Sequence, residues 1–191
     1  MIAQVEGKDY TCEEYLEFEL NSHERHEYID GKIILRNGGT PNHNQVAGNF
    51  SATLNFALRR QSYQVFIVDQ RLWIPNKRIY TYPDVMVVQG DLQMQEGRRD
   101  TITNPLIIGE VLSESTRSYD KDDKFAAYRT IPTFQEYILI DQYKVCVEQY
   151  FKTDTKRWTV TEYDDLNETL CLNSISFEIT LADIYNKVLF E

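Results

Sequence analysis

The chain has 191 residues, of which 42% are hydrophobic and 13% aromatic, and this is enough for one well-buried core. We therefore expect a single domain over residues 1–191. The sequence lacks a secretory signal pattern and an apolar run of about 18 residues, which predicts a cytoplasmic protein outside the membrane. A net charge of −10 argues against a protein that coats nucleic acid, but it is compatible with a nuclease whose acidic site holds cations.

The first third of the chain predicts a helix, a hairpin and a longer helix. Thr11 followed by Glu14 forms a capping box, so we expect a short helix to begin there. An Asp-Gly pair between two short β-rich segments predicts a hairpin at about residues 25–36. Between residues 43 and 60, apolar residues recur at steps of four, which favours a helix: Val46, Phe50, Leu54 and Leu58.

Strands are expected in the middle of the chain. Three β-rich runs with polar breaks lie at residues 64–69, 71–75 and 80–88, and the stretch after them is expected to be a polar loop. Residues 105–112 are apolar on both alternate faces, which predicts a central strand covered on both sides. A helix then fits residues 118–130, because Pro132 disfavours its continuation.

The last quarter of the chain predicts further strands and a final helix, which Thr180 caps and which runs over residues 181–190. The order of the predicted elements is helices first, strands in the middle, one helix and then more strands. This order indicates an α/β sandwich with a mixed sheet rather than a doubly wound parallel sheet.

Two carboxylates interrupt strands that are otherwise apolar. Asp84 lies near the start of YPDVMVV, and Glu110 lies inside IIGEVL. An unpaired carboxylate in such a strand is costly, so each acid needs either a basic partner or a shared metal ion. The two strands are consecutive, so a hairpin-like return would bring the acids together and a cation would offset their repulsion. Oxygen ligands favour magnesium or manganese over zinc.

Three runs in this order carry a family resemblance: YPDVMVV, NPLIIGEVLSEST and DKDDKFAAYRTIPTFQEYILID. They resemble the Uma-type family of candidate restriction endonucleases, which is common in cyanobacteria and belongs to the PD-(D/E)XK nuclease superfamily. The resemblance covers roughly residues 10–150. It implies a restriction endonuclease-like α/β/α core with a mixed central sheet, plus an N-terminal helix and β-hairpin. It also implies magnesium-dependent hydrolysis of phosphodiester bonds, with DNA as the expected substrate.

The resemblance also implies roles for single residues. Asp84 and Glu110 would hold the metal ion that activates a water molecule and stabilises charge on the phosphate. The motif is incomplete, because Leu112 stands where the superfamily has a lysine two residues after the second acid. Lys124, on the same helical face as Asp120, would replace that lysine and orient or deprotonate the water. The alternative is that Lys124 forms only a surface ion pair with Asp120.

Other residues are weaker candidates. Glu27 is either a further acid near the metal or a solvated carboxylate, and His43 either touches the site or lies on the surface. His23 and His26 have no third ligand at a zinc-like spacing, so we do not expect a zinc site. Five basic residues form either a rim for a phosphate backbone or only a solvated surface: Arg71, Lys77, Arg78, Arg98 and Arg99.

A metal-dependent endonuclease is thus the first hypothesis. The alternative is a catalytically inactive or regulatory binding protein of the same fold, because the displaced lysine and the charge of −10 both fit a loss of activity. A structural homodimer that uses exposed aromatic residues as its interface is a third reading. We expect a homodimer in any case, since a two-fold pair presents two sites to two antiparallel backbones.

Overall fold

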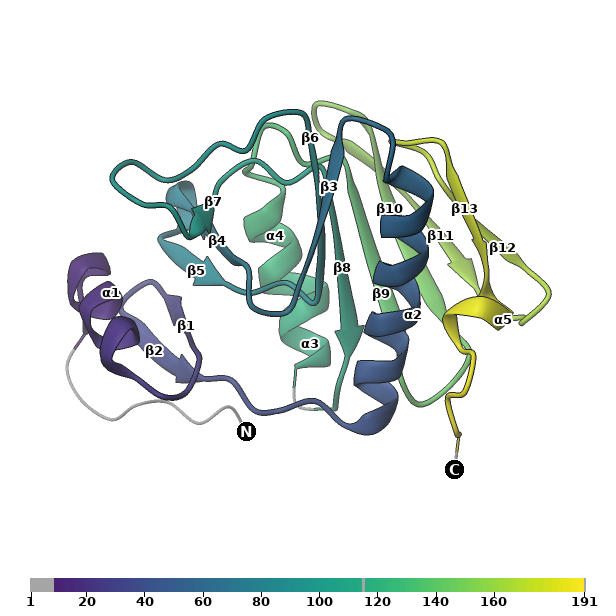
Figure 1. Ribbon diagram of the computed structural model, residues 1–191, viewed down its shortest axis with the longest axis horizontal. Helices are drawn as coiled ribbons and strands as arrows, with labels where there is room; N and C mark the ends of the chain where they lie inside the picture. The colour runs from purple at the N-terminus through teal and green to yellow at the C-terminus, as the bar shows by residue number, and fades with distance from the viewer. Residues whose placement is uncertain (1–8, 115, 191) are drawn as a thin grey trace.

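A six-stranded mixed sheet forms the centre of the computed structural model, which describes residues 9–114 and 116–190 (Figure 1). Its order is β11-β10-β9-β8-β6-β3, in which β8 and β9 are parallel and all other neighbours are antiparallel. The strands are β3 (Tyr63–Ile67), β6 (Val85–Gln89), β8 (Ile107–Leu112), β9 (Glu136–Asp141), β10 (Val147–Asp154) and β11 (Arg157–Tyr163). The predicted mixed sheet is therefore confirmed.

Helices cover both faces of this sheet. Helix α2 (Pro41–Leu58) packs on one face with alternate residues of β6 and β8, and Gly109 allows Phe50 to approach β8 closely. The other face carries a continuous helical segment made of α3 (Arg117–Tyr119), the π-helical η2 (Asp120–Lys124) and α4 (Phe125–Tyr128). Figure 1 shows this α/β/α arrangement, with the sheet between the two helical layers.

A second, five-stranded sheet joins the N-terminal segment to the core. Its order is β2-β1-β5-β4-β7, and α1 (Cys12–Asn21) begins with the predicted capping box. The predicted hairpin is present, and its turn places Asp30 and Gly31 at positive φ, where glycine fits without strain. The strands are β1 (His26–Ile29), β2 (Lys32–Leu35), β4 (Arg71–Ile74), β5 (Ile79–Thr81) and β7 (Thr101–Ile102), with the 3-10 helix η1 (Pro75–Lys77) after β4.

Three expectations from the sequence need correction. The run at residues 80–88 is not one strand but two, because Pro83 lacks the N–H that a continuous ladder needs, and β5 and β6 lie in different sheets. The expected polar loop contains the short strand β7. The final helix, α5 (Leu181–Ile184), is much shorter than predicted, and Lys187 adopts a positive φ that a helix cannot contain.

The C-terminal strands β12 (Thr169–Leu172) and β13 (Phe177–Thr180) form a hairpin that packs with α5 against α2 and extends that side of the core. Within the described ranges, none of the helices is both long and apolar enough to cross a membrane. The cytoplasmic location and the single-domain organisation remain predictions.

Candidate active site

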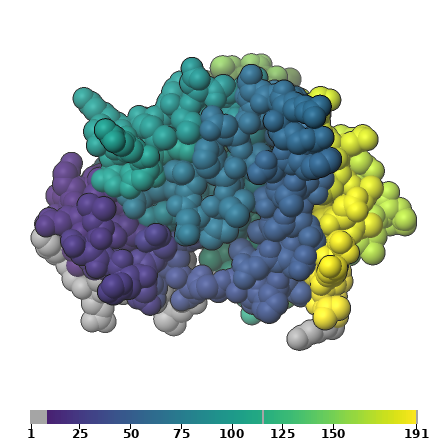
Figure 2. Space-filling model, in the orientation of Figure 1, coloured from purple at the N-terminus to yellow at the C-terminus, as the bar shows by residue number. Residues whose placement is uncertain are grey.

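A cavity of about 390 Å³ lies between the N-terminal hairpin, the start of α2, the adjoining ends of β6 and β8, and the α3–η2 helix. Figure 2 shows the surface hollowed between the N-terminal segment, in purple, and α2, in blue. Both acids that the sequence singled out line this cavity, as do Lys124, Glu27 and His43. Five separate elements of the chain therefore contribute to one site.

Asp84 and Glu110 lie side by side on neighbouring strands. The antiparallel pairing of β6 with β8 places Val85 opposite Gly109, so the preceding Asp84 faces Glu110. The backbone N–H of Asp84 donates to Glu110 Oε2 at 3.3 Å, and the N–H of Val111 donates to Asp84 Oδ2 at 2.9 Å. Asp84 is 4% exposed and Glu110 is 2% exposed. The predicted proximity of the two acids on one sheet is confirmed; their roles remain predictions.

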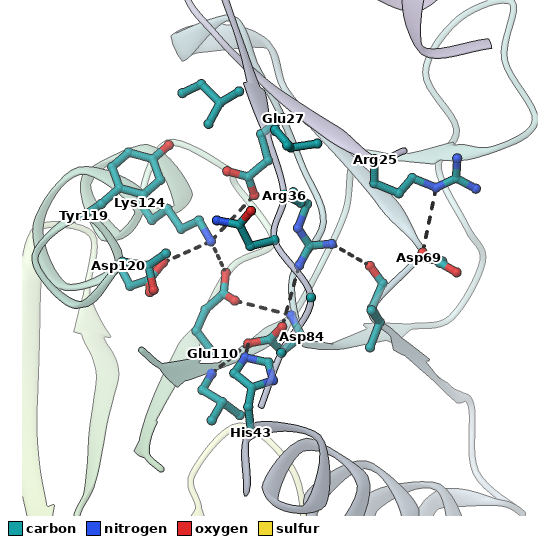
Figure 3. Close-up of a pocket in the computed structure, with 18 of the residues that line it drawn as sticks. Arg25, Glu27, Arg36, His43, Asp69, Asp84, Glu110, Tyr119, Asp120 and Lys124 are labelled. Atoms are coloured by element: carbon teal, nitrogen blue, oxygen red, sulfur yellow. Dashed lines mark hydrogen bonds and ion pairs between the residues drawn. The ribbon is translucent and has the colours of Figure 1, made fainter. Parts of the chain in front are cut away.

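Lys124 lies at the centre of a cluster of carboxylates (Figure 3). Its Nζ is 3.0 Å from Asp120 Oδ1, 3.1 Å from Glu110 Oε1 and 3.7 Å from Glu27 Oε1. Tyr128, one helical turn further, donates its hydroxyl to Glu110 Oε1 at 2.7 Å. Lys124 is buried, so its pair with Asp120 is not the surface ion pair of the alternative interpretation. The helix brings this ammonium group to the strand acids, as its spacing suggested.

Asp84 has its own basic neighbours on the opposite side (Figure 3). His43 Nε2 lies 3.2 Å from Asp84 Oδ2, and Arg36 Nη2 lies 3.7 Å from Asp84 Oδ1. Any side chain at Gly39 would meet the His43 ring, since a Cβ there would lie 2.7 Å from Nδ1. The N-terminal turn of α2 and the glycine loop before it therefore hold His43 against the acid.

Burial and charge shift the pKa values of these groups in different directions. Burial raises the pKa of Glu110 to about 8; Lys124 opposes this rise, while Asp84 and Asp120 add to it. Burial also acts to raise the pKa of Asp84, but the hydrogen bond and charge of His43 outweigh it, so that pKa is lowered. Burial acts to lower the pKa of Lys124, yet the three surrounding carboxylates raise it well above its ordinary value.

The donor set of the cavity fits a hard divalent cation. Asp84 and Glu110 offer carboxylate oxygens from adjoining strands, which suits magnesium or manganese. Burial is the main cause of the raised pKa of Glu110, Asp84 and Asp120 add to the rise, and a cation would offset the repulsion among these carboxylates. Asp84 and Glu110 are thus the residues that would hold the metal ion.

Glu27 and His43, the weaker candidates, also belong to the cavity. Glu27 is 8% exposed and its Oε1 accepts a hydrogen bond of 2.6 Å from Thr81, so it is not a solvated carboxylate. His26 instead pairs with Glu19, its Nδ1 lying 3.1 Å from Oε2.

The five basic residues that could have formed a rim do not line the cavity. Arg71 donates to Tyr82, Arg78 pairs with Asp30, and Arg98 pairs with Asp100. The arginines that line the cavity are Arg25 and Arg36, which sequence reasoning missed. The only local signal for Arg36 was its position between the hairpin and the Gly-Gly pair before α2, and periodicity does not reveal such a role.

Comparisons with known proteins agree with this fold. The model of the Uma2 family, described as "Putative restriction endonuclease", matches residues 12–182. The chain belongs to the Uma2 family. The resemblance noted in the sequence is thereby confirmed.

Two relatives come from Synechocystis sp., and both are described as uncharacterized. The protein sll1609 is 41% identical over 162 residues, which cover 85% of this chain and 92% of the relative. The protein slr1290 is 33% identical over 180 residues, which cover 93% of this chain and 92% of the relative. These relatives support the family without assigning an activity.

A solved structure shows the same fold. It is the crystal structure of "a putative nuclease belonging to DUF820" from Anabaena variabilis, with a TM-score of 0.77 and 18% sequence identity. The match covers 94% of this chain and 99% of the other. The predicted nuclease fold is confirmed, and at this identity the likeness carries the fold alone.

Proposed function

We propose that this Uma2 protein is a magnesium- or manganese-dependent endonuclease that hydrolyses phosphodiester bonds in DNA. One observation carries the proposal: two acids from adjoining strands and a buried lysine from a helix converge on one cavity, although they lie far apart in the sequence. The family description and the nuclease fold of the solved relative point to the same class of reaction.

Each residue of the cavity has a distinct part in this reaction. A bound divalent cation would lower the pKa of a water molecule and stabilise charge on the phosphate. Asp84 and Glu110 would hold that cation, and the hydroxyl of Tyr128 fixes the orientation of Glu110. Lys124, enclosed by three carboxylates, acts as a hydrogen-bond donor that orients the attacking water and neutralises phosphate charge.

Two further residues position Asp84. His43 and Arg36 lie against different oxygens of its carboxylate, so they set its rotamer before a cation arrives. Arg36 is partly exposed to the cavity, and its planar guanidinium suits a phosphate oxygen. A substrate phosphate would thus contact the cation that the acids hold. It would also contact the basic groups directly.

A non-catalytic binding protein of the same fold remains the second candidate, and one observation favours it. Lys124 already pairs with Glu110, Asp120 and Glu27. In a protein that has lost its catalytic activity, Lys124 could neutralise these acids permanently and exclude a divalent cation.

Cleavage assays separate the two candidates. We expect the wild type to cut a mixed panel of DNA substrates with Mg²⁺ or Mn²⁺ and to be inactive with a chelator. The double variant Asp84→Ala, Glu110→Ala should be inactive, whereas Asp100→Asn, a change of a carboxylate outside the cavity, should cut like the wild type. Intact substrate at high wild-type concentration with either metal would favour the binding protein.

A further inference from the structure

The cavity has an apolar side in addition to its ionic one. Besides the buried Val111, four aliphatic residues line it: Ile29 and the β2 residues Ile34 and Leu35 come from the hairpin, and Val68 comes from the turn between β3 and β4. All four are partly or largely exposed. A site that received only a phosphate and a metal ion would need no such wall, because both ligands are strongly hydrated and polar.

Val68 is held in a strained conformation at the cavity. Its φ is +46°, which a β-branched residue rarely adopts, and Asp69 N–H donates to Ile67 O at 2.6 Å across it, so Val68 is the central residue of a γ-turn. Such a conformation is strained and persists only when its surroundings enforce it. Val68 is nevertheless 40% exposed, so packing of its own side chain does not offset that strain.

The groups that hold Val68 belong to the acid site. Val68 N–H donates to the backbone carbonyl of Asp84 at 3.2 Å, and Arg36 Nη1 donates to the carbonyl of Val68 at 3.0 Å. Arg36 also lies against the carboxylate of Asp84. The backbone of Val68 is therefore fixed relative to Asp84 by one direct hydrogen bond and by a second one through Arg36.

Tyr119 adds an aromatic group to the cavity lining. Its hydroxyl is buried, and among the described residues it has no hydrogen-bond partner. A buried hydroxyl without a partner is unfavourable, so a ligand that supplies a hydrogen-bond partner would be favoured. Its ring and the aliphatic wall together suit a flat group that is apolar on its faces and polar at its edges.

The acids are also recessed. Asp84 and Glu110 are almost completely buried, and both line the cavity. Its volume of about 390 Å³ falls at the lower end of the ~300–1,000 Å³ of small-molecule sites. A nucleotide stacked in a duplex cannot enter such a space, whereas one that has left the stack can.

We propose that the cavity receives one unstacked nucleotide of single-stranded or locally unpaired DNA, with its phosphate at the acids and its base against Val68 and the hairpin wall. This inference rests on the proposed nuclease function and specifies its substrate class. Stacking and apolar contact with a base do not depend on its identity, so the proposal predicts structure-dependent rather than sequence-dependent cleavage.

The first test compares three DNA substrates of one sequence with Mn²⁺: a single strand, a perfect duplex and a duplex with one unpaired nucleotide. We expect the single strand and the bulged duplex to be cut at least tenfold faster than the perfect duplex. Equal or faster cutting of the perfect duplex would overturn the inference and leave the nuclease function intact. Failure to cut any of the three would remove both.

The second test is Val68→Gly. Glycine adopts positive φ freely, so this variant should fold at least as well as the wild type while it loses the apolar contact. We expect kcat/KM for the single strand to fall at least tenfold with unchanged Mn²⁺ affinity, and an abasic nucleotide at the cut position to abolish the difference between variant and wild type. Val160→Ala, a change of an exposed valine on β11, is the matched control. Wild-type kcat/KM in Val68→Gly would overturn the inference.

Discussion

Glu136 and Glu110 are both buried glutamates of the central sheet, on the neighbouring parallel strands β9 and β8, yet their surroundings differ. Among the residues that the structure describes, Glu136 accepts hydrogen bonds from neutral groups only: Gln149 Nε2 at 2.6 Å, the N–H groups of Asn173 and Ser174 at 2.9 and 3.0 Å, and the hydroxyl of Ser174 at 2.5 Å. These donors tie the turn between β12 and β13 to the sheet.

Glu110 lies among charges instead. Lys124 pairs with it, but burial raises its pKa, the neighbouring Asp84 and Asp120 add to this rise, and it lines an open cavity. Burial alone therefore does not distinguish a functional carboxylate from a structural one. Several carboxylates close together beside a cavity are a better criterion. They repel one another, and a bound cation would offset this repulsion, whereas a carboxylate that is hydrogen-bonded to neutral donors has no such repulsion to offset.

Loss of Lys124 should have the largest effect. We expect Lys124→Ala to lower the cleavage rate about 100- to 1,000-fold, because the developing charge loses its buried donor. Metal binding should change little. Leu112→Lys in that background should restore part of the rate, since residue 112 shares the strand face of Glu110, although a charge at this buried position should lower stability.

Single-turnover cleavage checks this prediction. Lys121→Ala is the matched control, because Lys121 belongs to the same helix but pairs with Glu148 outside the cavity. Full activity of Lys124→Ala would show that its role is confined to ion pairing.

Glu110→Gln should separate metal binding from folding. The amide is nearly isosteric with the carboxylate but carries no charge, so we expect the fold to persist and the affinity for Mn²⁺ to fall at least tenfold, about 1.4 kcal/mol. Calorimetric titration measures the affinity, and circular dichroism checks the fold. Unchanged affinity would mean that Glu110 is not a ligand.

Glu136→Gln should show the opposite pattern. The new amide would direct N–H groups at the donors of Asn173 and Ser174, so the free energy of unfolding should fall by about 1–3 kcal/mol. Mn²⁺ affinity should match that of the wild type. Urea denaturation together with the same titration tests both halves. A loss of Mn²⁺ affinity in Glu136→Gln would contradict the view that only Glu110 of these two glutamates takes part in metal binding.

Asp100, an exposed carboxylate, should show the smallest effect. The hydrogen bond from Arg98 lowers the pKa of Asp100 to about 2. A pKa lowered by folding adds stability above the ordinary pKa, and this contribution is lost as the pH falls from about 4 to about 2. Because the pair is exposed, we expect Asp100→Asn to cost less than about 1 kcal/mol at pH 7 and less still at pH 3. Urea denaturation at both pH values measures this difference, and a constant difference would contradict the assignment.

Local patterns in the sequence predicted most of the fold. The capping box at Thr11, the Asp-Gly turn and the four-residue spacing before Leu58 each depend on neighbouring residues, and each element is present. The single run at residues 80–88 was wrong because the choice of sheet on either side of Pro83 depends on distant strands. The final helix was overestimated for a similar reason, since its apolar residues pack against α2 without helical structure beyond Ile184.

The candidate site was only partly predictable. Asp84 and Glu110 stood out because a carboxylate in an apolar strand requires an explanation. Arg36 and Tyr119 did not, because arginine and tyrosine on loops and helix ends are common, and only the folded chain brings them to the acids. The burial of Glu136 could not be predicted either, because the groups that donate hydrogen bonds to it lie 13 to 38 residues further along the chain.

Calorimetric titration of Mn²⁺ into the wild type and into the double variant Asp84→Ala, Glu110→Ala measures whether these two acids bind a divalent cation. We expect saturable binding to the wild type and to Glu136→Gln, and loss of that binding in the double variant. Equal binding of Mn²⁺ by the wild type and the folded double variant would contradict this expectation.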